Sequence, residues 1–331
     1  MGSQNADIRE LIDICKGHRV YLQTHNIPDP DAIGAAFGLQ KLLAEFGIDS
    51  TICYDGSIDK LSSAKMLEIL GIEMYADQDI ADQMKPEDYI ICVDSQKNAG
   101  NITDLAGDEI ATIDHHPTTD RNAHIEYKYK DIRLYGACCT IITKYYMDLG
   151  ITPTADVATA LLYGLKMDTL QFSRGVCDED INVFAFLHHI KDAHKLSKLE
   201  MNNIEFGDLK AYGAAIENIR VFDYVGIVHI PFNCPDAMIA IVADFILSLV
   251  EIDIAIVYCN RPDGFKFSVR SEKDEVDAGE LIAEALEGIG NGGGHATMAG
   301  GRMTTEDIHK LGEYPDAEIT ERFLRALDLT F

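Results

Sequence analysis

Carboxylate and imidazole side chains follow several apolar segments in the first half of the chain. The segments VYLQT, YIICV and IATI each run directly into ionisable residues, and a further carboxylate ends the apolar pattern ATALLYGLKM. The candidates are His25, Asp29, Asp31, Asp94, Asp114, His115, His116 and Asp168. Side chains of these types serve as ligands and proton carriers in metal-dependent hydrolysis.

The number of these carboxylates points to a pair of metal ions. Carboxylates gathered at one place cannot all stay ionised without cations, because like charges raise each other's pKa. One ion would leave several of them unused, whereas two divalent ions that share a bridging carboxylate would not. Mixed imidazole and carboxylate ligands favour Mn²⁺ over Mg²⁺, and they do not exclude Zn²⁺ as the bound ion. Taken singly, each group is typical of a polar turn, a helix cap or a solvated loop, so the prediction rests on their combination.

The elements that must position these side chains alternate between strand and helix. Residues 6–17 and a segment beginning at Asp31 have helical patterns, and the latter helix is expected to end at Gly47. Strand patterns end at His25 and recur in DSTICY, DYIICVD and EIATIDHH, with helices expected at 136–149 and 153–168. This order predicts an α/β fold with a doubly wound, mostly parallel sheet. The carboxyl ends of its strands would bring the candidates together.

The length of 331 residues allows a second domain. Residues 178–218 have helical patterns, and strand and helix patterns return after them. We therefore expect a catalytic domain at 1–195, a helical connector at 196–215 and a smaller α/β domain at 216–331, across a cleft from the first.

A glycine tract near the C-terminus, GIGNGGGH, is the chemically suggestive feature of the second domain. Gly292, Gly293 and Gly294 could turn their backbone N–H groups toward an anion and form a nest, with His295 adding a side-chain contact. Arg270 offers a planar fork for phosphate. Taken alone, the tract is more simply interpreted as a flexible turn. The letters GIGNGG also fit the dinucleotide-binding pattern GxGxxG. That pattern must follow a strand, whereas this tract follows a helical pattern, so a dinucleotide-binding fold is rejected.

Composition limits the class of partner. The formal net charge of −27 should repel long nucleic acids, whose binding depends on neutralising many phosphates, but it permits a short phosphate ester in a local pocket. We find no signal peptide and no apolar run of membrane-spanning length. The 8 cysteines include no CxxC pair and lie mostly in apolar runs, as reduced thiols of a cytoplasmic protein do. The sequence leaves a homodimer open.

The motifs resemble those of the DHH phosphoesterase family, in the family's order and over nearly the whole chain. HNIPDPDA (25–32), VDS (93–95), DHH (114–116) and LKMDT (165–169) resemble its N-terminal motifs. GGGH (292–295), preceded by SVRS (268–271), resembles the motif of the DHH-associated C-terminal domain. Within the family, the two-domain form resembles the branch of oligoribonucleases and 3′-phosphoadenosine 5′-phosphate phosphatases.

This resemblance implies a role for each candidate. The first ion would be held by His25, Asp29 and Asp94. The second would be held by Asp31, Asp94, His115 and Asp168, so that Asp94 bridges the two. Asp114 would orient an imidazole, and His116 would contact the substrate phosphate or protonate the leaving oxygen. Arg270, the three glycines and His295 would bind the substrate.

Departures from the family's patterns leave this ligand set intact but leave the substrate open. Pro30 stands where the family often has glycine, Lys166 and Met167 replace small or polar residues, and Arg174 lies in a stretch that varies between branches. The favoured activity is that of a nanoRNase, an exonuclease on two- to five-nucleotide RNA that also dephosphorylates 3′-phosphoadenosine 5′-phosphate. The alternatives are an inorganic pyrophosphatase or exopolyphosphatase, a cyclic-dinucleotide phosphodiesterase and a non-catalytic binding module.

Overall fold

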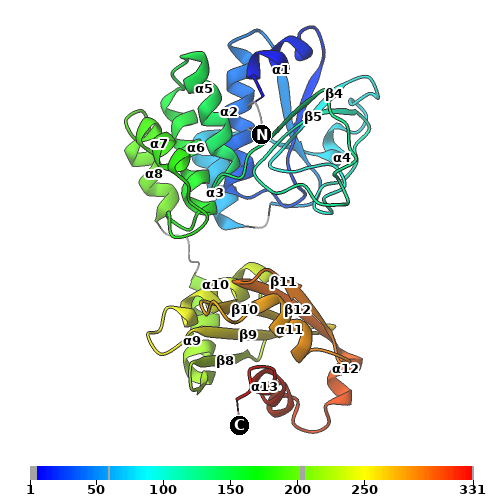
Figure 1. The fold of residues 1–331 in the computed structure, drawn as a ribbon, viewed down its shortest axis with the longest axis vertical. Coiled ribbons are helices and arrows are strands. Elements are labelled where there is room, and N and C mark those ends of the chain that lie inside the picture. The colour runs from blue at the N-terminus through cyan, green and yellow to red at the C-terminus, as the bar shows by residue number, and fades with distance from the viewer. Residues whose placement is uncertain (1–5, 59, 202–205, 330–331) are drawn as a thin grey trace. The chain divides into compact units, whose positions relative to one another are not determined.

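The chain forms two compact units, Met1–Asn203 and Ile204–Phe331. The computed structural model describes residues 6–58, 60–201 and 206–329, and each unit is considered by itself (Figure 1). None of the helices in these ranges is both long enough and apolar enough to cross a bilayer.

The first unit is built on a six-stranded parallel sheet with the order β3-β2-β1-β4-β5-β6. Its strands are β1 (Val20–Gln23), β2 (Ser50–Tyr54), β3 (Tyr75–Ala76), β4 (Tyr89–Val93), β5 (Asp108–Asp114) and β6 (Tyr129–Ile132). The chain proceeds outward from β1 to β3 and then returns to place β4 on the other side of β1. The adjacent strands β1 and β4 therefore mark the switch point where open α/β sheets bind ligands.

Most helices of this unit lie on one face of the sheet, where they belong to a single apolar cluster. They are α1 (Ile8–Cys15), α2 (Pro30–Ala44), α3 (Leu61–Leu70), α5 (Cys138–Leu149), α6 (Ala155–Asp168), α7 (Asp178–His188) and α8 (Ala193–Glu200). Glycines let α2 approach α6 closely: a Cβ at Gly34 would lie 2.8 Å from the carbonyl oxygen of Ala160, and one at Gly38 would lie 2.8 Å from a methyl of Leu161. The other face carries a smaller cluster that includes Ile80 of α4 (Asp77–Ile80).

The second unit contains a mixed six-stranded sheet with the order β11-β12-β10-β9-β8-β7, in which only β8 and β9 run parallel. The strands are β7 (Arg220–Phe222), β8 (Val225–Ile230), β9 (Ile254–Arg261), β10 (Gly264–Ser271), β11 (Asn291–Gly294) and β12 (Met298–Thr304). Alternate residues of β9 face opposite sides: Ile256 and Tyr258 join one apolar cluster and Val257 the other. The helices are α9 (Leu209–Asn218), α10 (Asp236–Leu247), α11 (Ala278–Ala285), α12 (Thr305–Lys310) and α13 (Pro315–Ala326).

The predicted α/β class is confirmed, with a parallel N-terminal sheet and a smaller second α/β unit. The division between the units falls within the expected connector, 196–215. Leu196 and Leu199 of α8 pack into the core of the first unit, whereas Ala211 and Ala215 of α9 pack into the second. All of the cysteines are free, and all but Cys177 are buried.

Candidate metal centre

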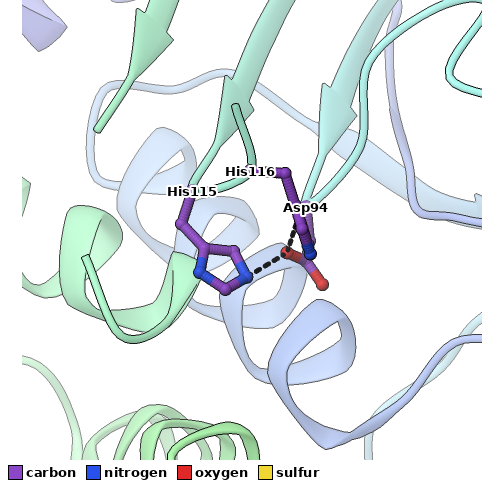
Figure 2. Close-up of side chains that lie close together, drawn as sticks. All are labelled: Asp94, His115 and His116. Atoms are coloured by element: carbon purple, nitrogen blue, oxygen red, sulfur yellow. Dashed lines mark ion pairs between the residues drawn. The ribbon is translucent and has the colours of Figure 1, made fainter. Parts of the chain in front are cut away.

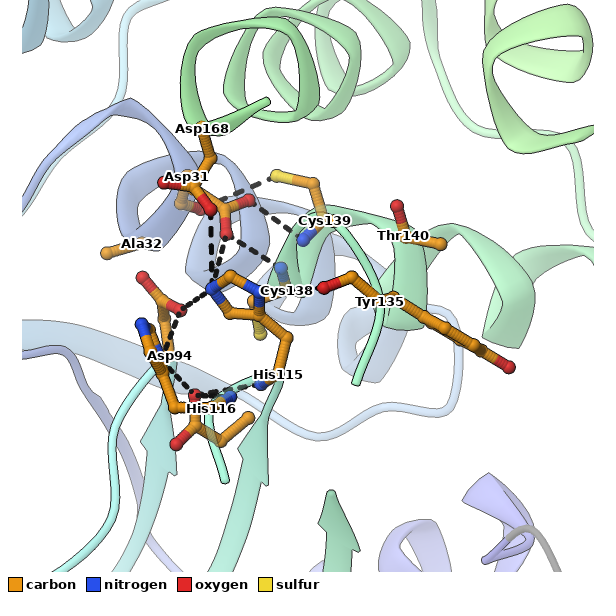
Figure 3. A network of polar contacts seen from close by, with 12 residues as sticks. Asp31, Ala32, Asp94, His115, His116, Tyr135, Cys138, Cys139, Thr140 and Asp168 are labelled. Atoms are coloured by element: carbon orange, nitrogen blue, oxygen red, sulfur yellow. Dashed lines mark hydrogen bonds and ion pairs between the residues drawn. The ribbon is translucent and has the colours of Figure 1, made fainter. Parts of the chain in front are cut away.

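The predicted ligands of the first unit converge at the carboxyl edge of its sheet. His25 follows β1, Asp94 follows β4, and His115 and His116 follow β5. Asp31 enters from the first turn of α2 and Asp168 is the last residue of α6. Figure 3 shows most of this cluster, with strand ends on one side and the helices on the other. Residues more than 100 positions apart in the sequence are thus neighbours.

Asp94 occupies the centre of this arrangement. Its Oδ2 lies 3.7 Å from Nε2 of His25, and its Oδ1 lies 3.4 Å from Nε2 of His115. Figure 2 shows its carboxylate facing both His115 and His116. The backbone of Asp94 has a φ of 58°, in the left-handed region that non-glycine residues rarely adopt. Strain of this kind persists where surrounding structure imposes it, commonly at functional sites.

His115 links Asp94 to the remaining carboxylates. Its Nε2 lies 3.4 Å from Oδ2 of Asp168 and 3.9 Å from Oδ2 of Asp31. On the other side of Asp94, Nε2 of His25 lies 3.8 Å from Oδ1 of Asp29. These separations are longer than good hydrogen bonds. Two ligands bound to one ion at about 2.1 Å lie about 3–3.5 Å apart, so the 3.4 Å separation of His115 from Asp168 is that of a coordination shell, and the 3.8 and 3.9 Å separations are slightly longer.

Potential ligand atoms within the described residues form three overlapping groups. One group contains His25, Asp29 and Asp94, and a second contains Asp31, His115 and Asp168. Asp94 also groups with His115 and His116. The first group contains the three residues expected for the first ion, and the second contains three of the four expected for the second; the fourth, Asp94, lies 3.4 Å from His115 of that group.

Backbone groups hold two of the ligands in place. The N–H groups of Cys138 and Cys139, at the start of α5, donate to the two oxygens of Asp31 at 2.7 and 2.9 Å. A carboxylate at a helix N-terminus is stabilised by the unpaired amides and the helix dipole. Nδ1 of His115 lies 3.0 Å from the carbonyl oxygen of Tyr135, which fixes the ring with Nε2 toward the carboxylates.

Asp114 lies within hydrogen-bonding distance of the imidazole of His116. Its Oδ1 lies 2.9 Å from Nδ1 of His116, and its Oδ2 accepts a hydrogen bond of 2.7 Å from the buried Gln96 side chain. The hydrogen bond to Asp114 raises the pKa of His116 above its usual value. The side chain of His116 is 56% exposed, so its protonated ring can meet a substrate.

The electrostatics of the cluster favour bound cations. Burial, together with the neighbouring carboxylates, raises the pKa of Asp94 well above its usual value and that of Asp168 to about 6. Burial also raises the pKa of Asp31. Oδ1 of Asp94 is buried and has no hydrogen-bond partner among the described residues. A buried acceptor left unpaired is costly, and a divalent cation would satisfy it. The donor set therefore fits a metal centre.

The glycine tract of the second unit does not form the predicted nest. Gly292, Gly293 and Gly294 lie in β11, an edge strand paired antiparallel with β12, and none of the three has a positive φ. A nest requires alternating helical conformations, which an extended strand excludes. Close packing explains two of the glycines: a Cβ would lie 2.8 Å from Ile282 at Gly292 and 2.5 Å from the carbonyl oxygen of Met298 at Gly294. A Cβ at Gly293 would meet open space.

The two side chains predicted to accompany the tract differ in their surroundings. Arg270, on β10, donates from Nε to Asp244 of α10 at 2.5 Å and from Nη1 to Ser268 at 3.0 Å. Its guanidinium is therefore partly committed to partners within the unit. His295 is exposed, and its backbone N–H donates to the carbonyl oxygen of Met298 at 2.8 Å.

Sequence reasoning missed the residues that support the ligands. Tyr135, Cys138 and Cys139 act through their backbone groups. The type of a residue does not indicate where its backbone N–H or carbonyl will lie in the fold. Gln96 was detectable in principle, because it follows the second motif directly as VDSQ. The pattern gave no indication that its side chain would turn back onto Asp114.

Comparison with known proteins identifies the family of each domain. Residues 19–165 match the DHH family, N-terminal domain, and residues 223–321 match the DHHA1 domain. The bifunctional oligoribonuclease and PAP phosphatase NrnA of Thermus thermophilus is 25% identical over 331 residues, covering 96% of this chain and 94% of that protein. Uncharacterized protein MJ1633 of Methanocaldococcus jannaschii is 32% identical over 287 residues, covering 85% of this chain. The match spans only 57% of the length of MJ1633.

Among solved structures, an exopolyphosphatase-related protein from Bacteroides fragilis has a TM-score of 0.74 at 18% identity, covering 98% of this chain and 100% of that one. This likeness establishes a shared fold. The family matches, together with the cluster of carboxylates and imidazoles, identify the class of protein as a metal-dependent phosphoesterase. With both domain models matched in order, the chain belongs to the DHH family and carries a DHHA1 domain.

Proposed function

We propose that this protein is a two-metal phosphoesterase that hydrolyses short oligoribonucleotides, 3′-phosphoadenosine 5′-phosphate, or both. The observation that carries the proposal is the placement of the Asp94 carboxylate, with one oxygen toward His25 and the other toward His115. A carboxylate that faces two ligand groups in this way is suited to bridge two ions.

The groups of potential ligand atoms support a ligand assignment in which Asp94 is shared, because Asp94 belongs to the group of His25 and Asp29 and also groups with His115. His25, Asp29 and Asp94 would hold one divalent ion, and Asp94, His115, Asp31 and Asp168 would hold the other. The mixture of imidazole and carboxylate favours Mn²⁺. When bound, such ions supply Lewis acidity toward water and toward phosphoryl oxygens.

His116 would contribute acid catalysis. Because Asp114 holds its Nδ1 at 2.9 Å, the second ring nitrogen is left to carry a proton toward the substrate. The Asp114 carboxylate also stabilises the protonated imidazole, and Gln96 keeps that carboxylate in place. This arrangement suits donation to the oxygen that leaves phosphorus, or to a developing charge on the phosphoryl group.

The substrate class rests on both domains and on charge. NrnA, which matches nearly end to end, is named for activity on oligoribonucleotides and on 3′-phosphoadenosine 5′-phosphate. A net charge of −27 disfavours a long polyanion but allows a short one held by local contacts. We assign binding of the substrate's remaining part to the second unit, through Arg270, His295 and the glycine strand Gly292–Gly294.

A substrate panel tests this proposal. RNA and DNA of two to five nucleotides, 3′-phosphoadenosine 5′-phosphate, a cyclic dinucleotide and pyrophosphate would each be assayed with Mn²⁺ and with Mg²⁺, and Asp94→Asn would serve as the inactive control. We expect the highest kcat/KM with short RNA or the adenosine bisphosphate. A preference for pyrophosphate or for the cyclic dinucleotide would reassign the substrate. No hydrolysis of any of them would leave the proposed activity without support.

A further inference from the structure

Asp180 is a buried carboxylate next to the metal centre. It is the third residue of α7, and its side chain is completely shielded from solvent. Its Oδ2 accepts a hydrogen bond of 2.8 Å from the backbone N–H of Cys177, which completes a capping box at the start of that helix. Capping alone would explain a carboxylate at this position, but Asp180 makes further contacts.

Asp180 also binds two groups that do not belong to its own helix. Oδ2 accepts a hydrogen bond of 2.9 Å from the backbone N–H of Gly136, and Oδ1 accepts one of 2.6 Å from the hydroxyl of Thr140. The other capping-box aspartate of the described residues, Asp307 of α12, bonds to Thr304 and to Lys310, both within four residues of it. Asp180 therefore joins α7 to the loop before α5 and to α5 itself.

The Gly136 contact leads directly to a candidate ligand. The N–H of Gly136 and the carbonyl of Tyr135 belong to one peptide group, and that carbonyl oxygen lies 3.0 Å from Nδ1 of His115. The same peptide is thus held by a carboxylate at its amide end and by an imidazole at its carbonyl end. Glycine is required here, because a Cβ would lie 2.8 Å from Oδ2 of Asp180 and 2.7 Å from the Thr169 side chain.

We propose that Asp180 is a positioning residue of the metal centre, which acts on His115 through the Tyr135–Gly136 peptide. A carboxylate hydrogen-bonded to a peptide N–H polarises the peptide and strengthens its carbonyl as an acceptor. The carbonyl then holds the proton on Nδ1 of His115, so that Nε2 keeps its lone pair for a metal ion. Metal-binding histidines are usually supported by a carboxylate or a carbonyl, and here the two act in series.

A second connection runs through α5. Thr140, which donates to Asp180, belongs to the first turn of the helix whose leading N–H groups bind Asp31. Asp180 thus fixes both the loop that orients His115 and the helix end that orients Asp31. This inference rests on the proposed metal centre, because positioning requires that these two residues bind an ion.

Two pairs of variants of the full-length protein separate positioning from capping. Asp180→Asn keeps the shape of the side chain and removes its charge, and Asp307→Asn makes the same change at the equivalent helix position of α12. Thr140→Val removes the hydroxyl that bonds to Asp180. Thr143→Val is the matched control, since Thr143 is equally buried in α5 and its hydroxyl bonds to the carbonyl oxygen of Cys139 in its own helix.

Two measurements would be made on each variant: the dissociation constant for Mn²⁺, and the NMR signal of the His115 Nδ1 proton in metal-free protein. We expect Asp180→Asn to weaken Mn²⁺ binding about 10- to 100-fold, the usual effect of removing a partner of a metal ligand. The Nδ1 proton should shift upfield as its hydrogen bond weakens. Thr140→Val should weaken Mn²⁺ binding severalfold, whereas Asp307→Asn and Thr143→Val should leave both measurements unchanged.

The outcomes distinguish failure of this inference from failure of the proposed function. Folded Asp180→Asn with the wild-type Mn²⁺ affinity and an unshifted Nδ1 signal would show that Asp180 only caps α7. If Asp180→Asn does not fold, an unchanged Mn²⁺ affinity in Thr140→Val overturns the inference instead. A wild-type protein that binds no Mn²⁺ would defeat the metal assignment, and the Nδ1 signal would still report whether Asp180 acts on His115.

Discussion

Oδ1 of Asp94 lies 3.4 Å from Nε2 of His115, and this buried oxygen has no hydrogen-bond donor among the described residues. The left-handed backbone of Asp94, with a φ of 58°, directs the carboxylate into the cluster at a cost of about 1–3 kcal/mol. The protein thus maintains an unpaired acceptor in a strained conformation. Both features are explained if the carboxylate serves ions on either side of it.

The first prediction concerns activity. Asp94→Asn should lower kcat by a factor of order 10²–10³ or more, because it removes the charge that stabilises both ions and the transition state they serve. Rates would be measured at saturating Mn²⁺ on the best substrate of the panel. Ser95→Ala is a suitable control, since the neighbouring hydroxyl donates to the carbonyl oxygen of Val93 at 3.4 Å and, within the described residues, makes no hydrogen bond to a candidate ligand. If Asp94→Asn turned over substrate at the wild-type rate, Asp94 would not be the carboxylate that bridges the two ions.

The second prediction concerns the stability of the metal-free protein. Asp94→Asn should raise the melting temperature in EDTA by about 2–4 °C for each kcal/mol of destabilisation that it relieves, because burial and then crowding by other carboxylates raise the pKa of Asp94 and destabilise its ionised form. Adding Mn²⁺ should reverse the order, since ligand binding stabilises the wild type by about 2.7 kcal/mol at a concentration of one hundred times Kd. A variant less stable than wild type in EDTA would contradict this account.

Much of the first unit was predictable because its signals are local. Apolar strands precede His25 and Asp94 and end at Asp114, and parallel packing brings such strand ends together. In the structure, potential ligand atoms of Asp94 group with those of His25 and Asp29 and also with those of His115 and His116. The contributions of Tyr135 and Cys138 were not predictable, because backbone N–H and carbonyl groups are common to all residues and only the folded loop aims them.

In the second unit, the conformation of the glycine tract was not predictable from the sequence. A strand is recognised by alternating side chains, and Gly292–Gly294 offer none, so the tract was predicted to turn. The absence of side chains lets the tract lie as a strand against α11. That helix packs so closely that a Cβ at Gly292 would contact Ile282. Glycine here allows close approach of a strand to a helix, and the freedom to turn is unused.

This difference between the glycines gives a third prediction. Gly293→Ala should leave the melting temperature nearly unchanged, because a Cβ at that position meets open space, whereas Gly292→Ala should lower it through a 2.8 Å clash with Ile282. If the open side of Gly293 receives substrate, Gly293→Ala should raise KM severalfold at constant kcat. Calorimetry and steady-state kinetics on the two variants would check this. An unchanged KM in Gly293→Ala would show that substrate does not bind at Gly293.

The last prediction concerns pH and a histidine of the second unit. His229 lies between two acceptors, with Nδ1 3.0 Å from Asp316 and Nε2 2.8 Å from the side-chain oxygen of Asn260, and its ring stacks on Tyr258. Burial lowers the pKa of His229, but the hydrogen bonds to Asp316 and Asn260 outweigh it and raise the pKa above its usual value. The protonated form is therefore the one that the fold stabilises.

Folding raises the pKa of His229, so its protonated form contributes to the free energy of unfolding. This contribution is fully present below the pKa of the unfolded state, about 6.5, and is lost as the pH rises through the pKa of the folded state. The free energy of unfolding of the second unit should fall between pH 6 and pH 9 by roughly 0.5–1 kcal/mol more in wild type than in His229→Gln, a modest amount because solvent screens the pair. Hydrogen exchange of β8 and β9 amides in urea would report on this unit alone. His309→Gln, an exposed histidine of α12, is the control. Equal pH dependence in wild type and His229→Gln would show that the Asp316–His229 pair does not stabilise the fold.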